Sequence, residues 1–275
     1  MELHNNELNV KPFLRWAGGK SWFIRYINQI LNGCEFVNYH EPFLGGGAVF
    51  LSIDIPSRAY LSDLNEELII TYKVIKEKPN DLIYILRQFT NSMECYYRIR
   101  EEEYHDDIHK AAKFVFLNQT SFNGLYRVNL QGKYNVPYGF RSKNFLDEES
   151  IHKASQKLQC ASLRYCDFMA VQNNIQKRDL VFLDPPYTVA HNKNGFIKYN
   201  QKLFSIEDQM RLSQLIDHIK SIGAFYVLTN AAHETIAQIF RKDDRLLELN
   251  RASLLGGKNA KRGSTTEFVF TNISE

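Results

Sequence analysis

The sequence has 275 residues, of which 44% are hydrophobic and 24% charged, the profile of a soluble globular protein rather than of a disordered or fibrous one. Its 34 basic and 31 acidic side chains give a net charge of +3, which neither demands nor excludes a nucleic-acid partner, because the sum does not say where the charges lie. The longest apolar runs fall far short of the roughly 20 residues that a membrane span needs, and residues 1–10 lack the apolar core of a secretory signal.

Strand and helix patterns alternate toward both ends of the chain. Five strands are predicted, at residues 36–39, 59–62, 163–166, 180–183 and 224–228. Helical patterns are predicted at residues 48–53, from Glu66 onward and at 206–219. Because carboxylates stand at the strand ends, this alternation predicts a doubly wound α/β sheet whose ligand crevice lies at the carboxyl ends of its strands.

Residues 76–159 have a different pattern. Apolar residues recur there at helical spacing, and the strand-like piece is a pair of short runs within residues 126–138 around Gln131-Gly132, which predicts a β-hairpin. We therefore expect a mostly helical domain at 76–159, inserted into an α/β domain formed by residues 1–75 and 160–275.

The cysteines Cys34, Cys95, Cys160 and Cys166 contain no C-x-x-C pair, so they indicate neither a zinc site nor a disulfide framework, and we expect a cytoplasmic protein without a resident metal. His105 and His109 have zinc-protease spacing, but Asp106 replaces the glutamate of that motif, which favours a solvated helix start. Lys20 ends a Walker-like segment in which Leu14 stands where the first glycine is required, so an NTPase is not indicated.

Gly45-Gly46-Gly47 forms a turn between a predicted strand and a predicted helix. Such a turn lets a ligand approach the backbone closely, although this run lacks the full G-x-G-x-x-G spacing. Asp63 follows at the end of the next strand, where an acid can accept hydrogen bonds from ribose hydroxyls. The pair suggests an adenosine-type ligand, and an N-capping role for Asp63 is the structural alternative.

Asp184-Pro185-Pro186-Tyr187 directly follows the apolar run 180–183. The two prolines fix the backbone and leave neighbouring carbonyls free to accept hydrogen bonds. An acid, a proline carbonyl and an aromatic ring at fixed spacing form a site for a planar group with an amino substituent: Asp184 and the Pro185 carbonyl accept its two hydrogens while Tyr187 stacks on the ring.

Five motifs occur in one order from about Pro12 onward: Phe13-Leu14-Arg15-Trp16-Ala17-Gly18-Gly19-Lys20, Glu41-Pro42-Phe43-Leu44-Gly45-Gly46-Gly47, Asn123-Gly124-Leu125-Tyr126-Arg127, Asn135-Val136-Pro137-Tyr138-Gly139 and Asp184-Pro185-Pro186-Tyr187. Together they resemble the Dam-type DNA adenine-N6 methyltransferases, including the methylases of GATC-specific restriction systems. The resemblance implies a Rossmann-like methyltransferase sheet, a helical target-recognition domain and S-adenosylmethionine as cofactor.

Roles can be carried over by resemblance. Asp184, Pro185, Pro186 and Tyr187 match the catalytic motif. Cofactor-binding positions are matched by Trp16, Lys20, Glu41, Phe43, Gly45, Gly47, Asp63, Asp167, Phe168 and Asp184, with Asp63 on the ribose and Asp167-Phe168 on the adenine. DNA-binding positions are matched by Arg15, Phe122, Asn123, Arg127, Asn135, Pro137 and Tyr138. Arg15 replaces a lysine and Phe122 a frequent tyrosine, and both changes keep the charge or the aromatic character.

The predicted chemistry follows from the position of adenine N6 inside the base stack. The enzyme must flip the nucleotide out, and Phe122 would occupy the vacated space. Asp184 and the Pro185 carbonyl would then accept both N–H bonds and expose the nitrogen lone pair for direct methyl transfer. Arg127 can read guanine with its forked donors, or it can hold a phosphate, and the sequence leaves both roles open.

Basic residues gather around the predicted hairpin, and a second group surrounds Gly256-Gly257, either as a loop tracking phosphates or as a solvated loop. The first group is Arg127, Lys133, Arg141 and Lys143, and the second is Arg251, Lys258, Lys261 and Arg262. We expect double-stranded DNA as partner, GATC as target, a monomer in solution, no membrane and a cognate restriction endonuclease system.

Two alternatives remain open at this point. One keeps the fold and acts on cytosine N4 or on adenine in RNA, although Asp184 before Pro-Pro-Tyr favours adenine by resemblance. The other is a non-catalytic DNA-binding module. It would require a broken cofactor pocket, whereas Gly45, Gly47, Asp63 and Asp184 are all present.

Overall fold

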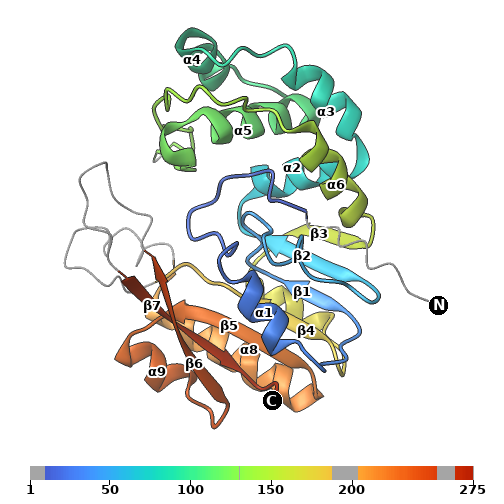
Figure 1. Cartoon of the computed structure of the whole chain (residues 1–275), viewed down its shortest axis with the longest axis vertical. Coiled ribbons are helices and arrows are strands. Elements are labelled where there is room, and N and C mark those ends of the chain that lie inside the picture. The colour runs from blue at the N-terminus through green and yellow to red at the C-terminus, as the bar shows by residue number, and fades with distance from the viewer. Residues whose placement is uncertain (1–9, 130, 188–203, 253–263, 275) are drawn as a thin grey trace. The chain divides into compact units, whose positions relative to one another are not determined.

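The computed structural model describes residues 10–129, 131–187, 204–252 and 264–274 (Figure 1). The chain divides into two compact units. The first unit consists of Met1–Ile27, Leu44–Asp54 and Ser62–Tyr165, and the second of Asn28–Phe43, Ile55–Leu61 and Cys166–Glu275.

Seven strands form one sheet in the order β3-β2-β1-β4-β5-β7-β6. Their bounds are β1 Tyr39–Glu41, β2 Ala59–Asp63, β3 Ala161–Tyr165, β4 Leu180–Leu183, β5 Phe225–Ala231, β6 Arg245–Ala252 and β7 Ser264–Thr271. Strand β1 pairs in parallel with β2 and β4, and β4 with β5, whereas β7 is antiparallel to both β5 and β6. The strand order reverses between β1 and β4, which is the topological switch point of a doubly wound sheet. The predicted α/β fold is confirmed.

The predicted strands agree with the structure to within a few residues, and the run at 180–183 coincides with β4. Strand β1 begins at Tyr39, so the apolar run at 36–39 leads into it rather than forming it. Strands β6 and β7 were not predicted from the sequence, and together they add an antiparallel hairpin beside β5.

The predicted helix at 48–53 is wrong. The segment forms successive turns, with Leu51 N–H donating to the Gly47 carbonyl and Ile53 N–H to the Val49 carbonyl. Gly47 is left-handed, with φ +64°, so a helix cannot begin before residue 48. Pro56 disfavours helical backbone at the residue before it, and the separate turns between these limits do not join into the continuous hydrogen-bond ladder of a helix.

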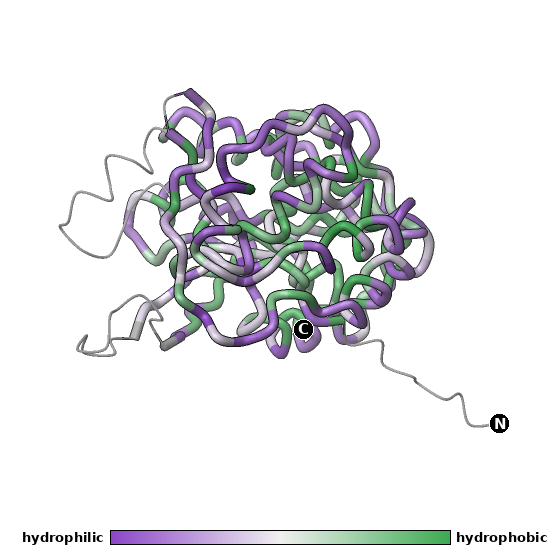
Figure 2. The backbone as a smooth tube through the Cα atoms, turned by 90° about the horizontal axis from the view of Figure 1, so that it is seen from above, coloured by the Kyte–Doolittle hydropathy of each residue, from purple (hydrophilic) through white to green (hydrophobic). Residues whose placement is uncertain are grey.

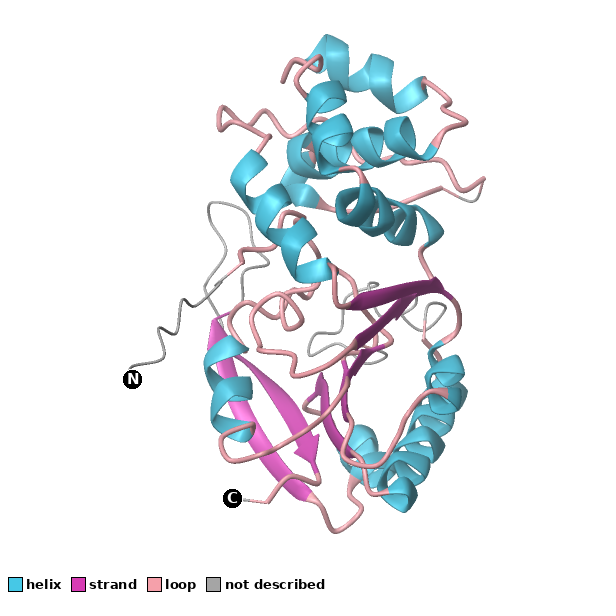
Figure 3. Ribbon diagram, turned by 90° about the vertical axis from the view of Figure 1, so that its right-hand side faces the viewer, coloured by secondary structure: helices cyan, strands magenta, loops and turns pink. Residues whose placement is uncertain are grey.

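Helix α8, Ile206–Ile222, packs along the sheet and closes the core of the second unit (Figures 1 and 3). Its apolar residues recur at helical spacing, and Leu212 and Ile216 lie in one buried cluster with Leu183 and Leu228 of the sheet. The helix starts with a capping box at Ser205 and ends at a left-handed glycine. Helix α9, Glu234–Phe240, and the short helix η2, Phe168–Asn173, also lie in this unit.

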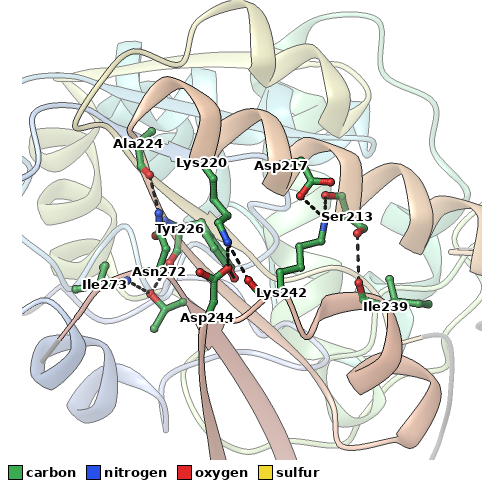
Figure 4. Close-up of polar contacts among 11 residues, drawn as sticks. Ser213, Asp217, Lys220, Ala224, Tyr226, Ile239, Lys242, Asp244, Asn272 and Ile273 are labelled. Atoms are coloured by element: carbon green, nitrogen blue, oxygen red, sulfur yellow. Dashed lines mark hydrogen bonds and ion pairs between the residues drawn. The ribbon is translucent and has the colours of Figure 1, made fainter.

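A polar cluster ties α8 to the amino end of β5 and to the chain entering β6 (Figure 4). Asp244 accepts hydrogen bonds from the Lys220 ammonium at 2.7 Å and from the Tyr226 hydroxyl at 2.9 Å. Lys242 donates to the Ser213 carbonyl at 2.8 Å and forms an ion pair with Asp217. These bonds offset the cost of placing a tyrosine hydroxyl and a carboxylate close to the core.

A second buried pair lies at the amino ends of β1 and β4. His40 Nε2 lies 2.8 Å from Asp179 Oδ2, and both side chains are fully buried. Asn38 and Gln176 add N–H donors to the Asp179 carboxylate. Burial raises the pKa of Asp179, but the hydrogen bonds from His40, Gln176 and Asn38 outweigh that effect and leave the pKa below its ordinary value.

The first unit contains most of the helices, shown in cyan to yellow-green in Figure 1. They are α2 Glu66–Glu77, α3 Pro79–Leu86, α4 Met93–Glu101, α5 Asp107–Thr120, α6 Glu148–Leu158 and the short η1 Phe122–Gly124, with α1 Ile24–Ile30 spanning the boundary of the two units. The predicted hairpin is present as a turn closed by the antiparallel bridge Val128–Tyr134 rather than as regular strands.

Apolar and polar segments alternate along the described backbone (Figure 2). None of the helices in the described residues is long and apolar enough to cross a membrane. His105 and His109 lie at the start of α5, where Asp106 caps the helix by accepting the His109 N–H, so the predicted helix start is confirmed.

Candidate active site

Asp184 and Pro185 emerge directly from the buried strand β4. The register pairs Leu183 with Leu228, which brings Thr229 of β5 beside Asp184. The Thr229 hydroxyl donates to Asp184 Oδ1 at 2.7 Å. Pro185 is buried and Pro186 exposed, so the two prolines carry the chain from the core to the surface within one turn. The acid is therefore held by the sheet on one side and by rigid backbone on the other.

Tyr187 is half-buried, and its hydroxyl donates to Glu267 Oε2 of β7 at 2.5 Å. Burial raises the pKa of Tyr187 well above its ordinary value, and the charges of Asp184 and Glu267 act in the same direction. The hydroxyl therefore stays protonated and acts as a donor.

Glu41 lies at the carboxyl end of β1 and is almost fully buried. The Tyr39 hydroxyl donates to Glu41 Oε2 at 2.8 Å. Burial raises the pKa of Tyr39, and the charges of Glu41 and Asp184 raise it further. Two residues after Glu41, Phe43 stacks on Phe168 with ring centroids 5.2 Å apart.

Gly45 and Gly47 both have left-handed backbone, with φ +47° and +64°. A Cβ on Gly45 would lie 2.7 Å from the Trp16 indole, and one on Gly47 would lie 2.6 Å from the Tyr72 hydroxyl. Both positions therefore require glycine, because of the backbone conformation and because of the close approach of an aromatic side chain.

Asp63 orients the glycine loop. Its Oδ2 accepts the Gly45 N–H at 2.9 Å, and its Oδ1 accepts the Asn65 N–H at 3.0 Å. Burial raises the pKa of Asp63, against the lowering effect of these backbone donors. The cap of helix α2 is Asn65, whose side chain accepts the Leu68 N–H, so the alternative role of Asp63 as the helix cap is wrong.

Trp16 and Lys20 belong to the first unit. The indole of Trp16 stacks on Phe114 and Tyr126, with ring centroids 6.4 and 5.7 Å away. Lys20 is 4% exposed, and its ammonium donates to the Gly18 carbonyl at 3.1 Å. Of the two side chains, that of Trp16 lies against the glycine loop of the same unit.

Asp167 and Phe168 lie at the start of η2 in the second unit. Asp167 Oδ1 accepts the Met169 N–H as the helix cap and forms an ion pair with Arg211 at 2.8 Å. The Arg211 guanidinium lies 4.8 Å from the centroid of the Phe168 ring. The Asp167 side chain remains 39% exposed, so its carboxylate is open to a further donor.

Two of the predicted DNA-binding residues lie together on the hairpin turn. Arg127 Nε donates to Asn135 Oδ1 at 2.7 Å, and a guanidinium N–H reaches the Asn135 carbonyl at 3.3 Å. Arg127 is exposed and Asn135 half-buried, so the amide holds the base of the guanidinium while its far edge faces solvent. Pro137 is exposed, whereas Tyr138 is buried and its hydroxyl donates to Asn91.

Phe122 and Asn123 lie in the exposed turn after helix α5. The Phe122 ring is 51% exposed, and Asn123 has left-handed backbone with φ +55°. The Phe122 N–H donates to the Pro137 carbonyl at 2.9 Å, which pairs this turn with the end of the hairpin. Phe140 follows this pairing in the chain. Its side chain is 76% exposed, and its backbone is also left-handed, with φ +51°.

Arg15 is anchored by Asn118 of α5, which accepts the Arg15 N–H at 2.8 Å and donates to the Arg15 carbonyl at 2.7 Å. Its guanidinium lies against Gly124. Burial lowers the pKa of Arg15, and the charge of Arg141 lowers it further. The Nη1 atom is buried and has no hydrogen-bond partner among the described residues.

The prediction of a basic loop at 251–262 is wrong for Arg251. This residue lies in strand β6 and forms an ion pair with the buried Glu267, so it is part of the sheet. The sequence suggested a loop because the neighbouring glycines and basic residues obscured the strand pattern. Lys258, Lys261 and Arg262 lie outside the described residues.

The family model of the D12 class N6 adenine-specific DNA methyltransferases matches residues 16–253. The chain is 33% identical to the type II methyltransferase M1.LlaDCHI of Lactococcus lactis, over 98% of both chains. It is 32% identical to the type II methyltransferase M.MjaIII of Methanocaldococcus jannaschii, over 82% of this chain and 85% of the relative.

The DNA adenine methylase of Escherichia coli is 34% identical over 82% of both chains. Among solved structures, a precorrin 8w decarboxylase from Methanobacterium thermoautotrophicum covers 98% of both chains at 12% identity and a TM-score of 0.42, too distant to carry an argument. The family match spans most of the chain. The chain belongs to the D12 class of N6 adenine-specific DNA methyltransferases.

The methyltransferase therefore acts on adenine in DNA and takes its methyl group from S-adenosylmethionine. This establishes the predicted activity over the alternatives of cytosine N4, RNA adenine or a non-catalytic module. The cofactor carries a sulfonium cation, two ribose hydroxyls and an adenine amine.

Sequence reasoning missed three residues that contact or extend the predicted site of the methyltransferase. They are Thr229, Glu267 and Phe140. Thr229 and Glu267 are far from the catalytic motif in sequence, and only strand pairing brings them to it. One signal was available for Glu267, an acid within the alternating β-branched and aromatic run of residues 265–271, which is typical of a strand.

Proposed function

We propose that this methyltransferase modifies adenine N6 within GATC in double-stranded DNA, after rotating the target nucleotide out of the helix. The observation that carries the catalytic assignment is Asp184, held at the end of β4 by the Thr229 hydroxyl and followed by the buried Pro185. An acid fixed in this way accepts a hydrogen bond without first reorganising, which is the condition for electrostatic catalysis.

Asp184 and the Pro185 carbonyl accept the two hydrogens of the adenine amine and so raise the availability of its lone pair. Tyr187 and Pro186 contact the faces and edge of the extruded base. S-adenosylmethionine, when bound, supplies the methyl group. The chain's own part is to orient the nitrogen, to exclude water and to stabilise the charge that the nitrogen acquires.

For the cofactor, we propose that Asp63 accepts from the ribose hydroxyls and that the glycine loop of Gly45 and Gly47 provides its backbone. Trp16, Lys20 and Glu41 line the same ligand, and Phe43, Asp167 and Phe168 bind its adenine. The exposed carboxylate oxygen of Asp167 supports this last assignment, because adenine N6 needs an acceptor.

For DNA, we propose that residues 76–159 form the target-recognition domain. Arg127, steadied by Asn135, reads a guanine, and Phe122 fills the place of the flipped base, with Asn123, Pro137 and Tyr138 forming its surroundings. Arg15 is a candidate phosphate contact, because its buried Nη1 has no hydrogen-bond partner among the described residues.

Phe140 extends the proposed DNA surface. Its ring is highly exposed and its backbone is strained, and Arg141 and Lys143 follow it directly in the sequence. A bulky residue in left-handed conformation is uncommon and is often found at functional sites. An exposed aromatic ring flanked by basic side chains suits stacking on a displaced base.

The enzyme's partners also belong to this proposal. Two relatives are named type II methyltransferases, and we propose that this enzyme likewise protects DNA against a cognate restriction endonuclease. A monomer in solution suffices for this role, because each transfer modifies one adenine on one strand.

The test is transfer of a labelled methyl group to synthetic duplexes, followed by mapping of the modified base. One duplex contains GATC and others differ from it at a single position. We expect label at adenine N6 of the GATC duplex and little on the others. Equal labelling of all duplexes would remove the GATC assignment, and the absence of transfer to any duplex would remove the catalytic one.

Arg127→Ala in the same assay tests the reading of guanine. Losing a two-pronged contact should cost discrimination at one guanine by about 5- to 150-fold, corresponding to about 1–3 kcal/mol. Lys143→Ala is the matched control, because an exposed lysine that contacts only phosphate should weaken binding equally on all duplexes when it is removed. A uniform loss for Arg127→Ala would show that it holds a phosphate instead.

A further inference from the structure

Glu267 is a fully buried carboxylate on strand β7. It accepts the Tyr187 hydroxyl at 2.5 Å and forms an ion pair with Arg251 of β6. The register places Glu267 opposite Ala231, the last residue of β5, and opposite Leu249 of β6. The acid therefore lies at the same end of β5 as Thr229, which holds Asp184.

Pro185 and Pro186 fix the backbone that leads to Tyr187, but they do not fix the two torsions that orient its ring. A hydrogen bond at the far end of the side chain constrains both torsions together. Because Glu267 belongs to a strand that is hydrogen-bonded on both sides, to β5 and to β6, it provides a rigid point of attachment. The plane of the ring is thereby set before any base arrives.

A buried carboxylate on a strand is costly, and an apolar residue would often serve stability as well. Val269, two residues along on the same face of β7, is such a residue and is fully buried. Arg251 balances the charge of Glu267, so the structure maintains an ion pair at this position. The carboxylate of this ion pair also accepts the hydrogen bond from Tyr187, which belongs to the Asp184–Tyr187 motif.

We propose that Glu267 is a positioning residue for adenine methylation, which holds the Tyr187 ring in the plane that stacks on the target base. Arg251 supports it by pairing with the carboxylate. The inference rests on the proposed role of Tyr187 and deepens it by naming what orients that ring. The protonated hydroxyl of Tyr187, described above, is the donor that this arrangement needs.

The test is a double-mutant cycle built from Tyr187→Phe and Glu267→Ala, with kcat and KM measured for duplex DNA and for S-adenosylmethionine. Each single variant should lower kcat by about tenfold, because each removes the same hydrogen bond. The double variant should be no worse than either single one, and KM for S-adenosylmethionine should change little. Glu267→Gln keeps an acceptor oxygen and should recover part of the activity.

The matched control is the other tyrosine, carboxylate and cation set of the second unit, Tyr226, Asp244 and Lys220 (Figure 4). Tyr226→Phe and Asp244→Asn should lower the unfolding temperature without changing kcat. If Glu267→Ala behaves in the same way, or if its effect on kcat adds fully to that of Tyr187→Phe, the proposal is overturned.

Tyr187→Ala tests the role of Tyr187 separately from the role of Glu267. Near-normal activity in that variant would remove the proposed role of Tyr187 itself. Strong loss in Tyr187→Ala together with additive effects in the cycle would leave the proposed function standing and overturn only the role of Glu267. Should Glu267→Ala fail to fold, Glu267→Leu, which has a similar volume and no acceptor, takes its place in the cycle with Tyr187→Phe, and the same comparison decides.

Discussion

The two ends of strand β5 use the same chemistry for different purposes. At its amino end Tyr226 donates to Asp244, which is paired with Lys220, and at its carboxyl end Tyr187 donates to Glu267, which is paired with Arg251. The first set joins elements of the fold and touches none of the proposed site residues. The second set holds a residue of the catalytic motif. A tyrosine bound to a carboxylate is therefore no sign of function until its position along the strand is known.

The comparison extends to the neighbouring parallel strands. The amino ends of β1 and β4 hold the buried pair His40 and Asp179, while the carboxyl end of β4 leads to Asp184. Residues at amino ends should therefore govern unfolding, and residues at carboxyl ends should govern turnover. Each of the following variants tests one side of this division.

Asp184→Ala should have the largest effect. Removing the acceptor that we assign to the adenine amine should lower kcat by about a hundred- to a thousandfold, the amount that one such electrostatic group contributes to catalysis. Binding of S-adenosylmethionine should remain measurable by equilibrium dialysis, and the unfolding temperature should change little. Activity within tenfold of the native enzyme would remove Asp184 from the centre of the mechanism.

Asp179→Asn should reduce stability by about 3 kcal/mol at neutral pH, because it breaks a buried pair and leaves His40 without its partner. The folded-state pKa of Asp179 lies below its ordinary value, so its stabilisation is present above the ordinary value and is lost as the pH falls through the folded-state pKa. Urea unfolding at several pH values should show the native and variant curves converging toward acid pH. A constant gap would contradict this assignment.

Asp244→Asn should reduce stability by about 1–2 kcal/mol, less than Asp179→Asn because Lys220 is partly exposed. The measurement is again urea unfolding, with kcat measured on the same preparation. An unchanged kcat places this cluster on the structural side of the comparison. A large fall in kcat with stability retained would break the division between the two ends of β5.

Thr229→Val should have the smallest effect. It keeps the shape of a buried side chain but removes the hydroxyl that donates to Asp184, so kcat should fall about tenfold. Thr229→Ser, which keeps the hydroxyl, is the matched control and should recover most of the rate. If valine and serine behaved alike, the hydrogen bond to Asp184 would have no role in turnover.

The strands and turns that carry the candidate site could be predicted from the sequence, because their signals are local. The apolar run before Asp184 and the Pro-Pro pair after it specify strand and turn without reference to the rest of the chain. Asp63 was predictable for the same reason, as the acid that closes a strand. The hydrogen bond that Asp63 accepts from the Gly45 N–H could not be predicted, because it joins residues 18 positions apart in the sequence.

The missed part of the site depends on strand pairing. Tyr187 and Glu267 are 80 residues apart, and the sequence around each of them does not indicate that their side chains are in contact. Strands β6 and β7 were missed because charged residues interrupt their apolar alternation, and two of those, Arg251 and Glu267, neutralise one another in the fold. The helix at 48–53 was wrong because a largely apolar run of six residues does not by itself distinguish a helix from the successive turns that the segment forms.

The place of β7 in chain order has a consequence for synthesis. The catalytic motif at residue 187 leaves the ribosome 80 residues before Glu267 does. At ordinary rates of translation this corresponds to about 4–16 seconds, during which β4 and the motif exist without the strand that orients Tyr187. A nascent chain in that interval lacks the completed sheet. With Glu267 in the positioning role proposed above, we expect chains that end before β7 to transfer methyl groups more slowly than the finished enzyme.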